Sequence, residues 1–256
     1  MLTHYGPTTG THRPVTAEVC PEIHSESTAE WAKQQFGFNA SPRQAEILDN
    51  DAKYLILRCN RQWGKTTTIA LKSLRHALNT PNTSICVISR TKQQAGRLIE
   101  KVSNCAVHLG MKIRRVLGQR YSFKFPNGSE IIAIPHNEDT SLGATANILI
   151  VDEAARVSDK VYFNVSPFVA RTHGSIWLLS TPNRQAGFFY NYWHDKDPRW
   201  TRVFSNVHDC PDLDPDFLDI QRRANPHLYA QDFECKFTQP PEYLLTADQV
   251  DRMIRN

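Results

Sequence analysis

Residues 57–67 read Leu-Arg-Cys-Asn-Arg-Gln-Trp-Gly-Lys-Thr-Thr. An apolar run, Tyr54 to Leu57, leads into this stretch, and a helical pattern, Lys65 to Asn79, leaves it. A nucleoside triphosphate binds where backbone N–H groups converge at a helix N-terminus, where a lysine reaches the β- and γ-phosphates, and where a hydroxyl ligates magnesium. The triplet Gly64-Lys65-Thr66 supplies these groups in the required order. The stretch therefore predicts a phosphate-binding loop between a strand and a helix.

Cys59 stands where the usual G-x-x-x-x-G-K-[ST] pattern has its first glycine. The short Gly-Lys-Ser/Thr signal would arise by chance in about one chain in ten of this size, so by itself it is weak. The interpretation as a phosphate-binding loop therefore depends on the predicted strand before the triplet and the predicted helix after it.

A second polar element follows the apolar run Ile148 to Val151, which ends in Asp152-Glu153. At the carboxyl end of a parallel strand beside a phosphate loop, Asp152 can hold magnesium, and Glu153 can orient or deprotonate the attacking water. A surface Asp-Glu pair that caps a helix is the competing interpretation. The all-apolar strand before the pair and the lysine loop favour the catalytic one.

The pattern around these two elements predicts an α/β fold. Apolar runs at 54–57, 85–88, 148–151 and 176–179 are typical of parallel strands covered on both faces. Helical spacing separates the first two runs and returns at Gln93 to His108. A hairpin is expected from Tyr121 to Ile134, with its turn at Asn127-Gly128.

Beyond residue 205 we predict no strands, only helices at Asp216 to Ala224 and Pro226 to Phe237. The expected organisation is a flexible arm at 1–28, a nucleotide-binding core at 29–205, and a lid or linker region at 206–256. Helix capping and solvation explain the acidic run between Asp209 and Asp219 better than a catalytic site does.

Charge and composition narrow the class of protein. Residues 53–124 hold 15 Lys and Arg against one acid, Glu100, which indicates an anionic partner such as a nucleotide or a nucleic acid. A solvated basic face without a ligand is the alternative. No apolar stretch approaches the roughly 18 residues of a membrane span. The six cysteines show no C-x-x-C pair, which favours reduced thiols over structural zinc.

Five ordered motifs resemble the ATPase domain of tailed-phage large terminase subunits. The resemblance covers most of residues 36–240. It rests on Phe38 with the segment Ser41-Pro42-Arg43-Gln44, the loop bearing Arg61, Asp152-Glu153-Ala154-Ala155, Leu179-Ser180-Thr181-Pro182-Asn183, and Gly187-Phe188-Phe189-Tyr190 with Trp193. It implies a three-layer P-loop NTPase of the ASCE/RecA-like type, with a mainly parallel central sheet and a small C-terminal helical lid.

The resemblance also implies residue roles. Arg61 would brace the γ-phosphate, and Phe38 and Gln44 would contact adenine. The loop residues Asn60, Gln62, Trp63 and Thr67 would join Gly64, Lys65 and Thr66 around the nucleotide. Ser180, Thr181 and Asn183 would couple hydrolysis to movement. Each role has a plain alternative: a surface arginine, an exposed helix start at Gln44, or a strand cut short by Pro182.

The sequence departs from the family in one place that bears on catalysis. Many relatives carry an Arg-Gly shortly before the second motif, from which a neighbour's arginine finger is expected, but residues 141–145 read Ser-Leu-Gly-Ala-Thr. Arg156, Arg171 and Arg184 are the remaining candidates. The chain is also too short to reach the nuclease domain of full-length terminases, so nuclease activity is not expected.

Three functions follow as hypotheses. The first is Mg²⁺-dependent ATP hydrolysis that drives double-stranded DNA into a viral prohead. Portal protein, small terminase subunit and a ring of identical subunits would be its partners in the host cytoplasm, with no membrane involved. The second is a superfamily 2 helicase-like DNA-dependent ATPase. The third is a nucleic-acid-binding module with an inactive nucleotide site.

Overall fold

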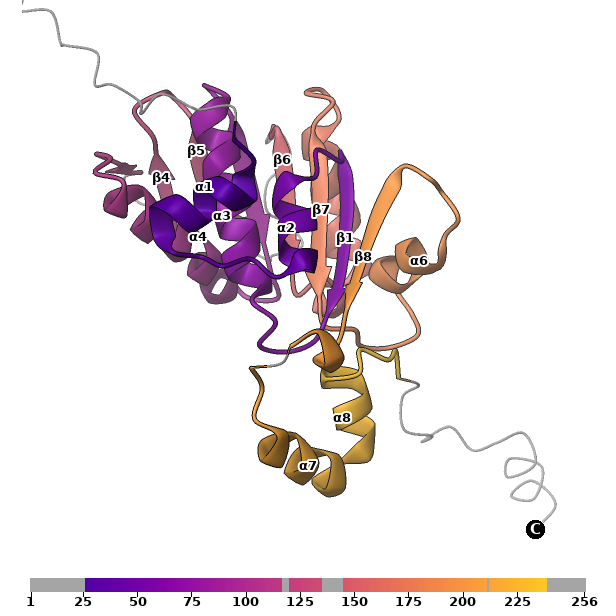
Figure 1. The fold of residues 1–256 in the computed structure, drawn as a ribbon. Helices are drawn as coiled ribbons and strands as arrows, with labels where there is room; N and C mark the ends of the chain where they lie inside the picture. Colours follow the sequence, from indigo (N-terminus) through magenta and orange to yellow (C-terminus); the bar gives the residue numbers. More distant parts are fainter. Residues whose placement is uncertain (1–25, 117–119, 135–144, 211, 239–256) are drawn as a thin grey trace, which may run out of the picture.

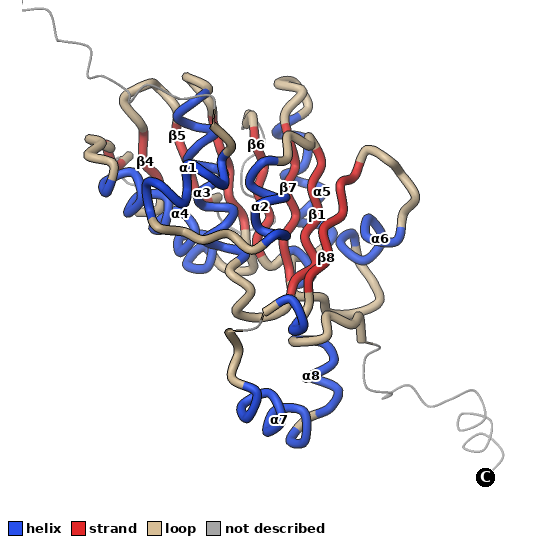
Figure 2. Tube along the Cα trace, in the orientation of Figure 1, coloured by secondary structure: helices blue, strands red, loops and turns tan. Residues whose placement is uncertain are grey.

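The computed structural model describes residues 26–116, 120–134, 145–210 and 212–238 of the 256-residue chain. Its described residues form one eight-stranded sheet with helices on both faces (Figures 1 and 2). The strand order is β3-β4-β5-β2-β6-β7-β1-β8. The strands are β1 (Tyr54–Cys59), β2 (Ser84–Ile88), β3 (Arg114–Arg115), β4 (Ser122–Lys124), β5 (Glu130–Ala133), β6 (Ile148–Asp152), β7 (Ser175–Ser180) and β8 (Trp200–Ser205).

Strand pairing is parallel from β5 to β8 across the sheet and antiparallel only at β3-β4-β5. The predicted α/β fold with a mainly parallel sheet is confirmed, as is the hairpin, which is formed by β4 and β5. The hairpin does not stand apart from the core, because β5 also pairs in parallel with β2.

Two apolar layers enclose the sheet. One face packs against α1 (Thr28–Phe36), α2 (Pro42–Asp49), α3 (Lys65–Asn79) and α4 (Lys92–His108). The other face packs against α5 (Asp159–Val165), α6 (Phe188–His194) and the short 3₁₀ helices Ala154–Arg156 and Ser166–Val169. The β1 side chains alternate between the layers: Leu55, Leu57 and Cys59 join the first, and Ile56 joins the second.

The helix after the phosphate loop has the bounds that its pattern predicts. Gly64 is its N-cap residue, and α3 ends at Asn79, two residues before Pro81. Its stripe of Ile69, Leu74 and Ala77 is fully buried under α4 and the sheet. The loop is therefore held between a central strand and a well-packed helix.

The C-terminal part of the described chain differs from the sequence prediction in two respects. Strand β8 was not predicted, and it pairs in parallel with β1 at the edge of the sheet. The predicted helix from Pro226 to Phe237 is shorter, because α8 (Pro226–Asp232) ends at Asp232 and Cys235 takes a positive φ of 58°. The 3₁₀ helix Val207–Asp209, α7 (Pro215–Ala224) and α8 share a small apolar cluster of their own. Figure 1 shows α7 and α8 beyond the end of the sheet.

Helices long and apolar enough to cross a membrane do not occur among the described residues. Five of the six cysteines lie in the described part of the chain, and all five are free thiols. Most of the predicted arm at 1–28 lies outside the described residues, which begin at residue 26. The stretch at 141–144 lies entirely outside them.

Candidate nucleotide-binding site

The loop from Asn60 to Gly64 turns sharply between β1 and α3. Gln62 and Gly64 take positive φ values of 62° and 93°. Glycine adopts this conformation without a Cβ penalty, and at Gly64 an added Cβ would lie 2.9 Å from the Gln44 amide nitrogen. No side chain caps α3, and no acid lies in its first turn, so its N–H groups remain available to an anion.

Lys65 joins this loop to the end of β7. Its ammonium donates to the backbone oxygen of Asn60 at 2.9 Å and to the Thr181 hydroxyl at 3.2 Å, although Thr181 is 116 residues away. Only 8% of the residue is exposed. A buried lysine without a carboxylate partner is unusual in proteins, and it is suited to bind phosphate oxygens that enter from the pocket.

Asp152 and Glu153 lie at the carboxyl end of β6. Asp152 is 6% exposed. Burial raises the pKa of its carboxyl to about 7, the charge of Glu153 adds to the rise, and Lys65 lowers it. Glu153 has a positive φ of 52°, a conformation that is uncommon for non-glycine residues and is enriched at functional sites. Its carboxylate forms an ion pair with Arg156 at 2.9 Å.

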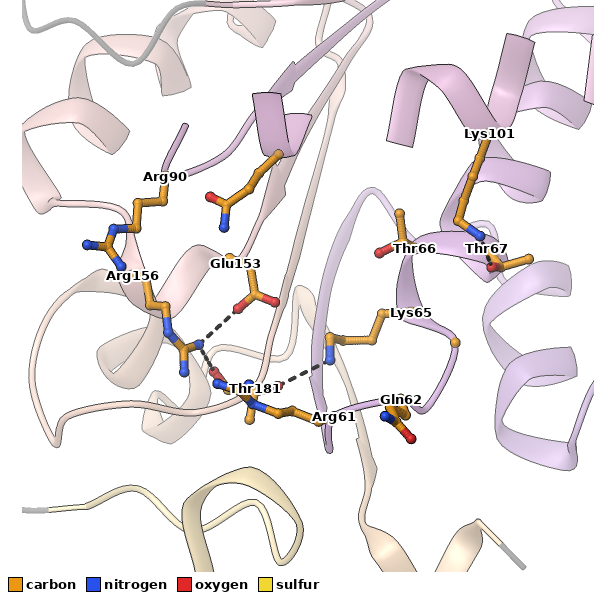
Figure 3. A pocket seen from close by; sticks show the side chains of 12 residues that line it. Arg61, Gln62, Lys65, Thr66, Thr67, Arg90, Lys101, Glu153, Arg156 and Thr181 are labelled. Carbon is orange, nitrogen blue, oxygen red and sulfur yellow. Dashed lines mark hydrogen bonds and ion pairs between the residues drawn. The ribbon is translucent and has the colours of Figure 1, made fainter. Parts of the chain in front are cut away.

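The phosphate loop, Glu153 and Thr181 line one pocket of about 540 Å³, whereas the buried Asp152 is not among its lining residues. Figure 3 shows Glu153 between Arg90 and Arg156 on one side and Lys65 and Thr66 on the other. The lining contains a single acid and five cations. The lining residues are Arg61, Gln62, Gly64, Lys65, Thr66, Thr67, Arg90, Gln94, Lys101, Glu153, Arg156 and Thr181.

The residues present fit a magnesium-bound triphosphate. The excess of cations complements the phosphate charge, and magnesium characteristically takes one or two carboxylates together with substrate phosphates. Asp152 and Thr66 are the groups that would hold it. Among the residues that the structure describes, no three His, Cys, Asp or Glu side chains form a separate metal-binding group.

Several predicted site residues lie beside the pocket and do not line it. Trp63 is buried in the core, and Phe38 packs against the same core. The Gln44 amide has two protein partners: it accepts from the Ser41 N–H at 2.9 Å and donates to the Trp63 carbonyl at 2.8 Å. The expected helix start at Gln44 is therefore present as a capping box, and the same side chain supports the phosphate loop.

The remaining loop and coupling residues make contacts behind the pocket. The Asn60 amide donates to the Arg61 carbonyl at 2.9 Å. The Ser180 hydroxyl donates to the Thr181 carbonyl at 2.6 Å. Asn183 donates to the Ala155 carbonyl at 3.4 Å and accepts from the Thr238 N–H at 2.9 Å. The segment after β7 is thus linked both to the Asp152-Glu153 turn and to the chain that follows α8.

Arg61 is connected to the C-terminal helices by Asp232, the last residue of α8. Its Nε lies 2.8 Å from the Asp232 carboxylate, and its backbone N–H donates to the Asp232 carbonyl at 2.9 Å. Arg156 Nη2 lies 4.0 Å from the other carboxylate oxygen. Asp232 is 4% exposed, so one buried carboxylate lies close to an arginine from each of the two motifs.

Asp232→Asn is expected to destabilise the fold by about 1 kcal/mol, because Arg61 would lose its carboxylate while remaining half-exposed to solvent. Urea unfolding measures this change. Asp219→Asn is the matched control, since Asp219 forms an exposed pair with Arg223 on α7 and should change stability by less than about 0.5 kcal/mol. Equal effects of the two variants would contradict a structural role for the Asp232 contact.

Three pocket residues were not found from the sequence: Arg90, Gln94 and Lys101. Lys101 on α4 donates to the Thr67 hydroxyl at 2.9 Å. The basic excess of residues 53–124 includes two of the three, but it does not distinguish them from the other cations. Of the arginine-finger candidates, Arg156 lines the pocket, whereas Arg171 and Arg184 do not.

Two acids of the run between Asp209 and Asp219 act as local caps, as the sequence predicts. Asp214 caps α7 by accepting from the Asp216 N–H at 3.0 Å. Asp209 accepts from the Asn206 N–H at 3.1 Å and from the Ser205 hydroxyl at 3.0 Å. These acids are accounted for by local capping.

Comparison with solved structures places this fold among large terminases. The ATPase domain of the Thermus phage P74-26 large terminase superposes with a TM-score of 0.70 at 20% identity, covering 83% of this chain and all of that one. The HK97 bacteriophage large terminase gives 0.59 at 18% identity over 86% of this chain and 48% of that one. The large terminase of a thermophilic bacteriophage, solved in complex with ATP-γ-S, gives 0.66 at 14% identity over 77% and 53%.

Sequence comparison gives the family. A probable terminase large subunit of Enterobacteria phage P7 is 30% identical over 136 residues, which cover 47% of this chain and 27% of that protein. The chain thus matches about a quarter of the length of this relative. The family model described as terminase large subunit, T4likevirus-type, N-terminal, matches residues 59–250. Because that match spans most of the chain and includes both the phosphate loop and the Asp152-Glu153 turn, the protein belongs to the T4likevirus-type terminase large subunit family, in its N-terminal part.

Proposed function

We propose that this chain is the ATP-hydrolysing part of a motor that moves double-stranded DNA into a viral prohead. The observation that supports this proposal most directly is that Lys65, Thr181 and Glu153 line the same pocket, where Lys65 donates to the Thr181 hydroxyl. The N-terminus of α3 beside them has no side-chain cap. Family membership supports the same proposal.

In the proposed reaction each residue acts on a named atom. Lys65 donates to oxygens of the β- and γ-phosphates, and Arg61 braces the γ-phosphate. The Thr66 hydroxyl and the Asp152 carboxylate would hold magnesium, which would supply positive charge to offset that of the phosphates. Glu153 accepts a proton from the water that attacks the γ-phosphorus. Orthophosphate and ADP are the products.

Coupling to movement would run through Thr181. When Lys65 turns toward phosphate oxygens, the Thr181 hydroxyl loses its donor. Two residues after Thr181, the Asn183 carbonyl accepts from the Thr238 N–H at 2.9 Å. The Gln185 N–H in turn donates to the Thr238 carbonyl at 3.2 Å. A change at the phosphate would therefore reach the chain after α8 through backbone contacts.

The proposed partners follow from the family and not from a described contact. They are double-stranded DNA, a portal protein, a small terminase subunit and further copies of this chain in a ring, in the cytoplasm of an infected bacterial cell. The proposed division into an arm at 1–28, a core at 29–205 and a lid or linker at 206–256 belongs to the same hypothesis.

The first test is phosphate release by the purified 256-residue chain. We expect turnover with ATP and magnesium, and none when EDTA removes the metal. The activity should be weak if neighbouring subunits complete the motor. DNA binding that falls steeply with salt while ATP is not hydrolysed would instead indicate a nucleic-acid-binding module with an inactive nucleotide site. Strand separation of a forked duplex would indicate the helicase-like alternative.

A further inference from the structure

Arg90 stands out among the cations of the pocket because it has no protein partner among the described residues. The other four are each engaged: Arg61 with Asp232, Lys65 with Thr181, Lys101 with Thr67 and Arg156 with Glu153. Arg90 lines the same pocket, is exposed, and forms no hydrogen bond or ion pair with any residue that the structure describes. Within the described part of the chain, therefore, no protein group competes with an anion for its guanidinium.

Sheet register explains why Arg90 reaches this pocket. Ile88, the last residue of β2, pairs with Val151 of the parallel strand β6. Arg90 follows Ile88 by two residues, and Glu153 follows Val151 by two residues. Neighbouring strands lie about 4.8 Å apart, so the two residues leave the sheet side by side.

The strand order also sets the side from which Arg90 approaches. In the sequence β2-β6-β7-β1, the phosphate loop follows β1 and Glu153 follows β6. Arg90 follows β2, on the other side of β6 from the loop. Figure 3 shows this opposition: Arg90 lies across the pocket from Lys65 and Thr66. A γ-phosphate that Lys65 holds, with its attacking water at Glu153, would lie between the two cations.

We propose that Arg90 is the arginine that stabilises the charge of the transition state for hydrolysis, and that it acts on the nucleotide of its own subunit. This inference rests on the proposed ATP hydrolysis. In phosphoryl transfer, charge develops on the equatorial oxygens of the γ-phosphate, and a guanidinium offers them two parallel hydrogen bonds. An arginine supplied by the same chain performs this role in some NTPases.

Two further observations favour Arg90 over the other arginines. The stretch at 141–145, where relatives are expected to carry the finger of a neighbouring subunit, contains no arginine. Arg156 is held by the carboxylate of Glu153 and also donates to the Thr181 carbonyl at 3.4 Å, so its binding to phosphate would break existing contacts. Arg90 would break none among the described residues.

The first test compares Arg90→Ala with Arg97→Ala, which removes an exposed arginine of α4 outside the pocket. We expect the kcat of R90A to fall by about 10³-fold or more, while R97A stays close to wild type. Binding of a fluorescent ATP analogue to R90A should weaken by less than about tenfold. Trapping of ADP with aluminium fluoride, which mimics the transition state, should be lost. Unchanged turnover in R90A would overturn the proposal.

The second test decides whose nucleotide Arg90 serves. R90A is mixed with Glu153→Gln, a variant with an intact Arg90 but no catalytic carboxylate. If Arg90 acts within its own subunit, every active site in the mixture lacks one essential group, and turnover stays at the level of the separate variants. Recovery of turnover on mixing would show that Arg90 completes a neighbour's site, and it would overturn the assignment to the same subunit.

Phosphate release by the wild-type chain distinguishes a wrong role for Arg90 from a wrong proposal of ATP hydrolysis. If the wild type releases no phosphate although it binds the ATP analogue, the proposed hydrolysis is wrong, and the Arg90 role is wrong with it. If the wild type and R90A turn over equally, hydrolysis stands and only the role of Arg90 falls.

Discussion

Lys65→Ala is expected to abolish ATP turnover, with kcat/KM reduced by at least about 10³-fold. Lys65 is the buried cation that joins the phosphate loop to the end of β7, through Asn60 and Thr181. Alanine removes the charge that would bind the β- and γ-phosphates both in the ground state and in the transition state. We therefore expect weaker nucleotide binding as well as slower chemistry. Phosphate release and titration with a fluorescent ATP analogue measure the two effects.

A second lysine of the same helix serves as the matched control. Lys72 is also buried on α3, but its ammonium donates to the carbonyls of Leu48 and Asn50 and lies outside the pocket. Burial lowers the pKa of Lys72 to about 8. Lys72→Met should leave turnover within about threefold of wild type, even if the melting temperature changes. Loss of turnover in K72M alone, or its retention in K65A, would contradict the proposed site.

The local parts of the fold were predictable because each has its own signal. The α3 helix has an apolar stripe, a glycine at its start and a proline after its end. The four central strands are short apolar runs because helices cover both of their faces. No information from distant residues is needed to find them.

Strand β8 was missed because its sequence does not show the pattern of a buried parallel strand. It lies at the edge of the sheet, and only Trp200, Val203 and Ser205 are buried. Arg202 interrupts the apolar pattern, yet it is well accommodated, since its guanidinium donates to carbonyl groups such as those of Tyr192 and Trp193. Such a set of acceptors is created by tertiary structure and cannot be read from residues 200–205.

The candidate site shows the same division between local and distant information. Lys65, Glu153 and Thr181 were assigned to one site from the order of their motifs, and the structure brings them together in one pocket. Arg90 belongs to no such motif. Its position depends on β2 lying beside β6, which is a property of the strand order and not of the residues around Arg90. The contact of Gln44 with the Trp63 carbonyl likewise depends on how α2 packs.

Glu153→Gln is expected to reduce kcat by about 10²- to 10⁴-fold while the ATP analogue still binds. Glutamine has nearly the same shape as glutamate but cannot accept a proton from the attacking water. The substitution also removes the ion pair with Arg156, whose two partners are partly exposed, so it should change the free energy of unfolding by only about 1 kcal/mol. Single-turnover phosphate release measures the chemical step separately from product release.

Glu130 is the matched control for Glu153, because it is also a glutamate in an ion pair with a basic residue. Glu130 on β5 pairs with Lys124 at 3.2 Å and lies outside the pocket. Glu130→Gln should therefore keep wild-type turnover. If E153Q bound no nucleotide, the carboxylate would be needed to build the pocket and not to move a proton. If E153Q hydrolysed ATP at the wild-type rate, the base would have to be another group, and Asp152, the adjacent buried carboxyl, would be the first to substitute.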